Sequence, residues 1–226
     1  MRYNVDAVIF DFDGVLVDTG LDIANAMNFV LRESGLAELP ADTIIGFIGR
    51  GAGKLVQDSL GEEHAGLLDQ ALSMFLERYS RYYLVDTCLY PGVKEVLQSL
   101  HQARVRVAIA TQKSEPITHS ILSGLAIDPF ITMVVGPESI THRKPHPESL
   151  LRVIQAFDID PPGVLMVGDM PTDIQAGKAA GARTCAVTYG LGERAALEAA
   201  GPDFMIHEIK DLLILLEEST EPFPRR

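Results

Sequence analysis

Six polar residues follow apolar, strand-like runs or lie in the loops between them, and their types could together act on a charged substrate. They are four aspartates, a threonine and a lysine: Asp11, Asp13, Thr111, Lys144, Asp169 and Asp173. Carboxylate oxygens are the ligands that a hard cation prefers, so Asp11 and Asp169 could share one such ion. The sequence therefore predicts a site that combines a divalent cation such as Mg²⁺ with a lysine and a hydroxyl group.

The two neighbouring aspartates suit two different chemical roles. Asp11 can attack phosphorus as a nucleophile, while Asp13 handles the proton of the leaving group. A carboxylate that approaches a phosphate dianion meets strong repulsion. The cation, Lys144 and the Thr111 hydroxyl are the groups expected to offset that repulsion.

The elements that must position these residues alternate between strand-like and helix-like sequence. Apolar runs rich in β-branched residues occur at 5–10, 105–110, 164–167 and 184–187, with a weaker run at 204–206. Helix-like segments separate them, which predicts an α/β fold with a parallel sheet. Ligands in such sheets bind at the carboxyl ends of the strands, where the polar residues lie.

One region interrupts the alternation. Residues from about 21 to 85 show only helical periodicity, and a second long helix is expected over residues 64–84. This stretch is too long for an ordinary crossover between two strands. We therefore expect a core domain of residues 1–17 and 88–226, with residues 18–87 inserted as a small helical domain.

Composition and charge narrow the classes of partner. The formal net charge of −12 disfavours a nucleic-acid partner and means that an anionic substrate needs local cations. No apolar run is long enough to span a bilayer, so no membrane partner is expected. The two cysteines, Cys88 and Cys185, lack metal or redox spacing, and no signal peptide is evident. These features favour a cytoplasmic location.

The motifs also carry a family resemblance over nearly the whole chain. Residues 11–19 (DFDGVLVDT) resemble the first signature of the haloacid dehalogenase superfamily, and Thr111, Lys144 and residues 168–173 (GDMPTD) resemble the other three in order. The resemblance implies a Rossmann-like core with a helical cap of the C1 type. It also implies Mg²⁺ and a covalent aspartyl phosphate on Asp11.

The residue two positions after the nucleophile divides the chemistries of that superfamily. Its dehalogenases and phosphonatases lack an aspartate there, whereas its phosphatases and phosphomutases have one, as this chain does at Asp13. The resemblance further implies that the backbone carbonyl of Asp13 is a third protein ligand of the metal. It implies that Asp173 orients Lys144 or a metal-bound water.

Within the superfamily the chain most resembles bacterial phosphoglycolate phosphatases. The resemblance rests on residues 48–52 (IGRGA), 90–93 (YPGV), 143–148 (RKPHPE), 173–181 (DIQAGKAAG) and 188–190 (TYG). It implies a small anionic phosphate ester as substrate, specifically 2-phosphoglycolate. Gln112, which we expect to contact substrate, departs from the asparagine common after the second-motif threonine.

The segment 49–54 (GRGAGK) has two interpretations. It lacks the spacing of a nucleotide-binding P-loop and follows no convincing strand. It is either a plain turn before a helix or a grip for a substrate carboxylate, formed by Arg50, Lys54 and the free N–H groups of the helix start.

Other functions remain open on the sequence alone. One is a phosphomutase of the β-phosphoglucomutase type, which shares the core and the cap position, and another is a pyrophosphatase. A third is a non-catalytic member of the fold that serves as a binding module, since fold does not establish activity. The sequence is compatible with a monomer or a homodimer.

Overall fold

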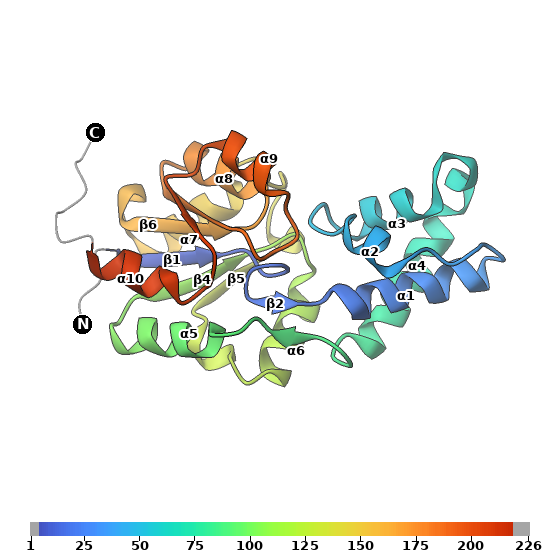
Figure 1. The fold of residues 1–226 in the computed structure, drawn as a ribbon, viewed down its shortest axis with the longest axis horizontal. Helices are drawn as coiled ribbons and strands as arrows, with labels where there is room; N and C mark the ends of the chain where they lie inside the picture. Colours follow the sequence, from blue (N-terminus) through green and yellow to red (C-terminus); the bar gives the residue numbers. More distant parts are fainter. Residues whose placement is uncertain (1–4, 219–226) are drawn as a thin grey trace. The chain divides into compact units, whose positions relative to one another are not determined.

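A six-stranded parallel sheet forms the centre of the larger of two units (Figure 1). The computed structural model describes residues 5–218. The strand order is β5-β4-β1-β6-β7-β8, and every paired neighbour runs parallel. The strands are β1 (Ala7–Phe10), β4 (Arg106–Ala110), β5 (Met133–Val135), β6 (Val164–Gly168), β7 (Arg183–Val187) and β8 (Phe204–Ile206). This confirms the predicted parallel α/β sheet.

The sheet is buried because helices cover both of its faces. All four residues of β1 are fully buried, as their apolar sequence AVIF predicts. Helices α7 and α8 pack on the face that presents Ala7 and Ile9, and Figure 1 shows α5 on the opposite side. The helices of this unit are α5 (Val93–Gln102), α6 (Glu115–Gly124), α7 (Glu148–Phe157), α8 (Pro171–Ala179), α9 (Arg194–Ala200) and α10 (Asp211–Glu218), with short 3₁₀ turns at Asp128–Phe130, Pro137–Ser139 and Pro161–Gly163.

The chain divides into two compact units. One contains the described residues up to Val17 and from Leu89 onward, and the other is Asp18–Cys88. The smaller unit is helical, with α1 (Gly20–Glu33), α2 (Ala41–Ile45), α3 (Ala52–Leu60), a 3₁₀ segment η1 (Glu62–Leu67) and α4 (Leu68–Tyr82). At the junctions, β2 (Val17–Asp18) and β3 (Cys88–Leu89) pair as a separate two-stranded sheet.

Two details differ from the sequence-based expectation. The edge strand β5 was not predicted, because its three residues form too short an apolar run to stand out. The second long helix begins at Leu68 and not at residue 64, because His64 has non-helical angles (φ −113°, ψ 19°) and residues 62–67 form a 3₁₀ segment.

A buried carboxylate ties the two ends of the smaller unit together. Asp22, in the first turn of α1, is only 2% exposed. It accepts hydrogen bonds from the backbone N–H groups of Val85 (2.9 Å), Asp86 (3.0 Å) and Thr87 (3.0 Å). These bonds fix the segment that returns from α4 toward β3. None of the helices between residues 5 and 218 is long and apolar enough to cross a membrane.

Candidate active site

Three neighbouring strands place three of the predicted residues at one edge of the sheet. Asp11 directly follows β1, Thr111 follows β4, and Asp169 follows β6. Because β1 lies between β4 and β6 and all three strands are parallel, their carboxyl ends lie side by side. Backbone bonds extend this order past the strands, since the N–H of Asp11 donates to the Val167 carbonyl at 2.9 Å.

Lys144 reaches this edge from the loop before α7, and its ammonium group has three close acceptors. Its Nζ lies 3.1 Å from Asp11 Oδ1 and 2.6 Å from Asp173 Oδ1, and it donates to the Ala110 carbonyl at 2.8 Å. The ammonium group thus makes one hydrogen bond to the backbone and two ion pairs with carboxylates. Burial alone would lower the pKa of Lys144, but the carboxylates of Asp11 and Asp173 raise it above its usual value. Lys144 is therefore a fixed positive charge.

Asp173 holds Lys144 from the first turn of α8. One of its oxygens contacts the ammonium group, and the other accepts the backbone N–H of Met170 at 3.0 Å. The second bond caps the helix start, so the position of α8 determines where this carboxylate points. Sequence resemblance predicted that Asp173 orients Lys144 or a metal-bound water, and its contact with Lys144 is compatible with the first of these roles.

The carboxylates of Asp11 and Asp169 are both buried, and they lie close enough for their charges to interact. Burial raises the pKa of Asp11 to about 7, with Lys144 opposing the shift and Asp173 adding to it. Burial also raises the pKa of Asp169 well above its usual value, and the charge of Asp11 adds to that. Several carboxylates in a desolvated site favour protons unless further positive charge, beyond that of Lys144, balances them.

These residues fit a divalent cation. Asp11, Asp169 and Asp173 each offer an oxygen, and the three oxygens lie within 4.8 Å of one another. Asp169 Oδ2 accepts the Leu191 N–H at 2.7 Å, whereas its Oδ1 is buried without a hydrogen-bond partner among the described residues. Three carboxylates against one ammonium leave a formal charge of −2, which one divalent ion would neutralise.

Three glycines surround Asp169, and a side chain at any of them would overlap its atoms. A Cβ atom at Gly14, which has a φ of +83°, would overlap Asp169 Oδ2. A Cβ at Gly190 would overlap the side chain of Asp169, and one at Gly192 would overlap its backbone oxygen. The loop 190–192 therefore belongs to the site, although the sequence pointed only to Gly190, as part of a family motif.

Asp13 has a different cation partner from Asp11. Lys113 Nζ lies 3.2 Å from Asp13 Oδ1, and its backbone N–H donates to the Thr111 hydroxyl at 3.1 Å. Thr111 is itself buried, and Gln112 beside it is half-buried. Sequence reasoning missed Lys113. The available signal was its position two residues after Thr111, at the end of the same strand.

The comparison with known families decides the classification. The family model for haloacid dehalogenase-like hydrolases matches residues 8–187, which include all six polar residues named at the outset. The chain belongs to the haloacid dehalogenase-like hydrolases. This confirms the family that the four motifs indicated.

Individual relatives of this hydrolase cover nearly its whole length. A phosphoglycolate phosphatase from Nitrosospira multiformis is 36% identical over 96% of this chain and 97% of that protein. One from Pseudomonas putida is 34% identical over 91% of this chain and 78% of that protein. Among solved structures, a predicted phosphoglycolate phosphatase from Haemophilus somnus has a TM-score of 0.87 at 26% identity, covering 94% of this chain and 98% of that one.

Arg50 and Lys54 belong to the smaller unit of the hydrolase, where both contact the same acid. Asp58 lies 3.3 Å from Arg50 and 2.6 Å from Lys54, and the two cations remain about half exposed. Helix α3 begins directly after Gly51, whose φ of +85° suits glycine. Sequence reasoning missed Asp58, although its i+4 spacing from Lys54 on a helix is a recognisable signal.

Proposed function

We propose that this hydrolase cleaves small phosphate monoesters through an aspartyl phosphate on Asp11, with 2-phosphoglycolate as substrate and Mg²⁺ as cofactor. The observation that carries the proposal is the buried set of Asp11, Asp169, Asp173 and Lys144 at the carboxyl edge of the sheet. The names of the full-length relatives support the choice of substrate.

The metal would be held by Asp11, Asp169 and the backbone carbonyl of Asp13. When bound there, Mg²⁺ supplies positive charge that offsets the repulsion between the attacking carboxylate and the phosphate. Two observations support this assignment: Asp169 Oδ1 has no hydrogen-bond partner within residues 5–218, and the pKa values of Asp11 and Asp169 are raised.

In the first step, a carboxylate oxygen of Asp11 forms a bond to phosphorus while the bond from phosphorus to the ester oxygen breaks. Lys144 holds the Asp11 carboxylate through its 3.1 Å contact. The Thr111 hydroxyl, at the end of the neighbouring strand, is proposed to help offset the charge of the phosphate. Asp13, protonated at this point, gives its proton to the departing ester oxygen, which thereby becomes the hydroxyl group of glycolate.

In the second step, water cleaves the aspartyl phosphate. Asp13, now ionised, takes a proton from water as the water oxygen bonds to phosphorus and the Asp11 oxygen departs. Lys113 is placed to hold the Asp13 carboxylate during this exchange, because its ammonium lies 3.2 Å away. Asp11 ends the cycle as a free carboxylate and phosphate is released.

We propose that residues 18–87 act as the cap that selects the substrate. Within it, Arg50, Lys54 and the start of α3 offer positive potential to the carboxylate of 2-phosphoglycolate. Gln112, at the end of β4 in the core, is proposed as a further substrate contact. Asp58 competes for both cap cations, so substrate has to replace an existing ion pair.

A substrate panel tests the reaction. The purified protein is assayed with Mg²⁺ against 2-phosphoglycolate, p-nitrophenyl phosphate, pyrophosphate and β-glucose 1-phosphate, following both phosphate release and sugar-phosphate isomerisation. We expect the highest kcat/KM for phosphate release from 2-phosphoglycolate, and loss of turnover in Asp11→Asn. Isomerisation exceeding hydrolysis would favour a mutase, preference for pyrophosphate a pyrophosphatase, and no turnover on any ester a binding protein.

A second experiment tests the cap cations. A charge-assisted contact is worth about 1.5–3 kcal/mol, or roughly ten- to a hundredfold. We therefore expect Arg50→Ala to lower kcat/KM for 2-phosphoglycolate by that factor and Lys54→Ala by less, with p-nitrophenyl phosphate barely affected. Asp58→Asn, which frees both cations, should act in the opposite direction. Equal losses on both substrates would assign the loop to folding of the cap.

A further inference from the structure

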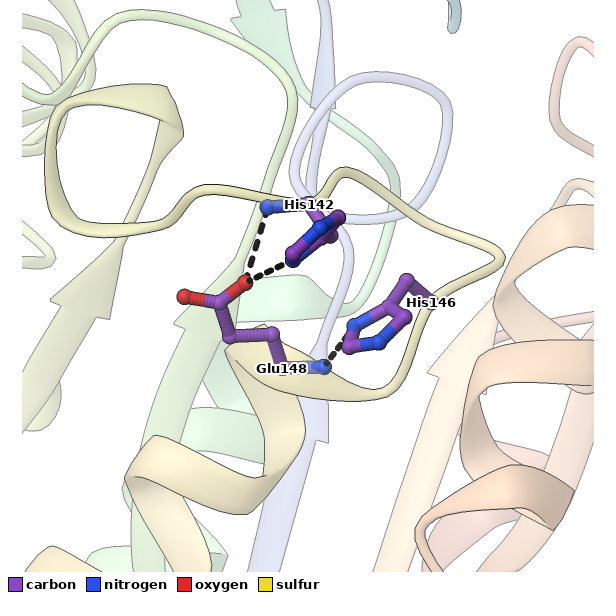
Figure 2. Close-up of side chains that lie close together, drawn as sticks. All are labelled: His142, His146 and Glu148. Atoms are coloured by element: carbon purple, nitrogen blue, oxygen red, sulfur yellow. Dashed lines mark hydrogen bonds and ion pairs between the residues drawn. The ribbon is translucent and has the colours of Figure 1, made fainter.

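A second group of potential metal ligands lies in the loop that carries Lys144. His142 and His146 are exposed and Glu148, the first residue of α7, is half-buried (Figure 2). Each offers one ligand atom, and these atoms lie within 4.8 Å of one another. The two imidazole rings face each other with centroids 4.6 Å apart and an angle of 34° between their planes. The hydrolytic reaction proposed above uses none of the three.

The Glu148 carboxylate is held in place by the backbone. Its Oε1 accepts the N–H of Thr141 at 2.9 Å and lies 3.8 Å from Arg152 Nε. Its Oε2 accepts the N–H of His142 at 2.8 Å and lies 3.1 Å from His142 Nδ1. The bonds from Thr141 and His142 lower the pKa of Glu148 to about 2, so it is an anion wherever histidine is neutral. The oxygen that faces the imidazoles is thus a fixed, charged acceptor.

The imidazole nitrogens that face this carboxylate are suited to hold a metal. His146 Nδ1 accepts the backbone N–H of Glu148 at 3.3 Å, so in the neutral ring its lone pair is on Nδ1. That bond is long and readily replaced. His142 Nδ1 shares its hydrogen bond with Glu148 Oε2, and loss of this one proton would give a second nitrogen lone pair beside the same oxygen.

We propose that His142, His146 and Glu148 form a binding site for one divalent transition-metal ion such as Zn²⁺ or Ni²⁺, separate from the acidic cluster. Imidazole nitrogen with one carboxylate is a donor set that suits these ions, whereas Mg²⁺ prefers oxygen alone. Two ligands of tetrahedral zinc lie about 3.3 Å apart when each bond is about 2.0 Å. The 3.1 Å between His142 Nδ1 and Glu148 Oε2 is close to this, and a ligand atom of the exposed His146 lies within 4.8 Å of the other two.

A helix cap alone does not account for the group. Glu148 would serve the loop equally well through its bonds to the N–H groups of Thr141 and His142 if both imidazoles were absent. The two rings add two ligand atoms to the one of the Glu148 carboxylate, which gives three on one solvent-facing loop. The fourth position stays open to water, which is compatible with an ion that arrives from solution.

The binding test uses the full-length chain without a histidine tag, in millimolar Mg²⁺ so that the acidic cluster is occupied. Zn²⁺ or Ni²⁺ is titrated by calorimetry, and bound metal is counted after equilibrium dialysis. We expect one ion per chain. Since loss of an outer partner already weakens metal sites about 10–100-fold, His142→Ala, His146→Ala and Glu148→Gln should each weaken binding at least tenfold. His119→Ala, an exposed histidine on α6, should leave binding unchanged.

Two further readouts locate the ion. Nitrogen NMR of the imidazoles should show Nδ1 of His142 and His146 shifting on addition of Zn²⁺, with His119 unaffected. The same titration in Asp169→Asn should still give one bound ion, because that variant alters only the acidic cluster. Unchanged zinc affinity in the His142→Ala/His146→Ala double variant, or loss of binding in Asp169→Asn, would overturn the proposal. So would the absence of binding at tens of micromolar Zn²⁺.

Discussion

Lys113 Nζ lies 3.2 Å from Asp13 Oδ1, and their side chains are only 7% and 12% exposed. Asp11 and Asp13, the two aspartates proposed to act in catalysis, therefore have separate lysines, because Lys144 contacts Asp11. Asp13 has to exchange a proton in both steps of the proposed reaction, and Lys113 is its neighbouring charge. The pair gives the first prediction.

Replacing Lys113 by Met keeps the length of the side chain and removes its charge. An ammonium group stabilises a neighbouring carboxylate, the form of Asp13 that the second step needs as a base, so we expect kcat for 2-phosphoglycolate to fall about ten- to a hundredfold, the worth of a charge-assisted contact. Aspartyl phosphate should accumulate with p-nitrophenyl phosphate, whose leaving group needs little protonation in the first step. Asp13→Ala should show the same accumulation, and Lys94→Met, on the exposed side of α5, should show neither effect. Slower turnover without accumulation would mean that Lys113 acts on the fold.

Mg²⁺ should stabilise the protein more as pH rises. In the metal-free protein the pKa of Asp11 is about 7 and that of Asp169 is also raised, so the folded state keeps protons that the unfolded state releases above about pH 4. Stability without metal therefore falls as pH rises between about 4 and 7. Mg²⁺ competes with those protons, so the Tm increase it produces should grow from pH 5 to pH 8.

Thermal unfolding with and without saturating Mg²⁺ at several pH values measures this dependence. In Asp169→Asn the increase in Tm should be largely lost. An increase that is the same at pH 5 and pH 8 would show that the ion does not displace protons from these carboxylates.

The glycine at position 192 should resist substitution. A Cβ there would overlap the backbone oxygen of Asp169, so Gly192→Ala has to move one of the two segments. We expect a loss of about 1–3 kcal/mol in the free energy of unfolding and weaker Mg²⁺ binding. Gly53→Ala is the matched control, because no atom lies near its Cβ position in α3, and it should stabilise by about 0.5–1 kcal/mol. Chemical denaturation measures the free energy of unfolding of both variants, and a similar value for the two would contradict the expected overlap at Gly192.

The buried Asp22 should be essential to the smaller unit. Its carboxylate accepts hydrogen bonds from three backbone N–H groups. An amide would replace one of its two oxygens by an NH2 group, which would face those N–H donors without being able to accept from them. Asp22→Asn should therefore cost about 1–3 kcal/mol of unfolding free energy. Asp69→Asn, also in the first turn of a helix but exposed, should change stability little. Hydrogen exchange at the amides of residues 85–87 should speed up in Asp22→Asn alone.

The sequence predicted the sheet well because its strands are buried on both faces and so consist of nearly unbroken apolar residues. It also predicted that Asp11, Thr111 and Asp169 follow strands, but the order that makes these strands neighbours came from the structure. It did not reveal the roles of Lys113 or Asp58, because the sequence pattern does not show which side chain a charged residue will contact in the fold. The crowding of Gly190 and Gly192 against Asp169 depends on the closeness of two loops more than twenty residues apart, and periodicity contains no such information.

The chain leaves the core at β2 and returns at β3, and these two strands are hydrogen-bonded to each other. The insertion therefore begins and ends at one pair of strands, and no strand of the six-stranded sheet lies within it. A different module with adjacent ends could replace residues 18–88 while the carboxyl edge with Asp11 and Asp169 keeps its local geometry. If residues 18–87 select the substrate as proposed, substrate preference can change by exchange of this segment while the residues of the reaction stay in place, and chimeras joined at β2 and β3 are the way to exchange it.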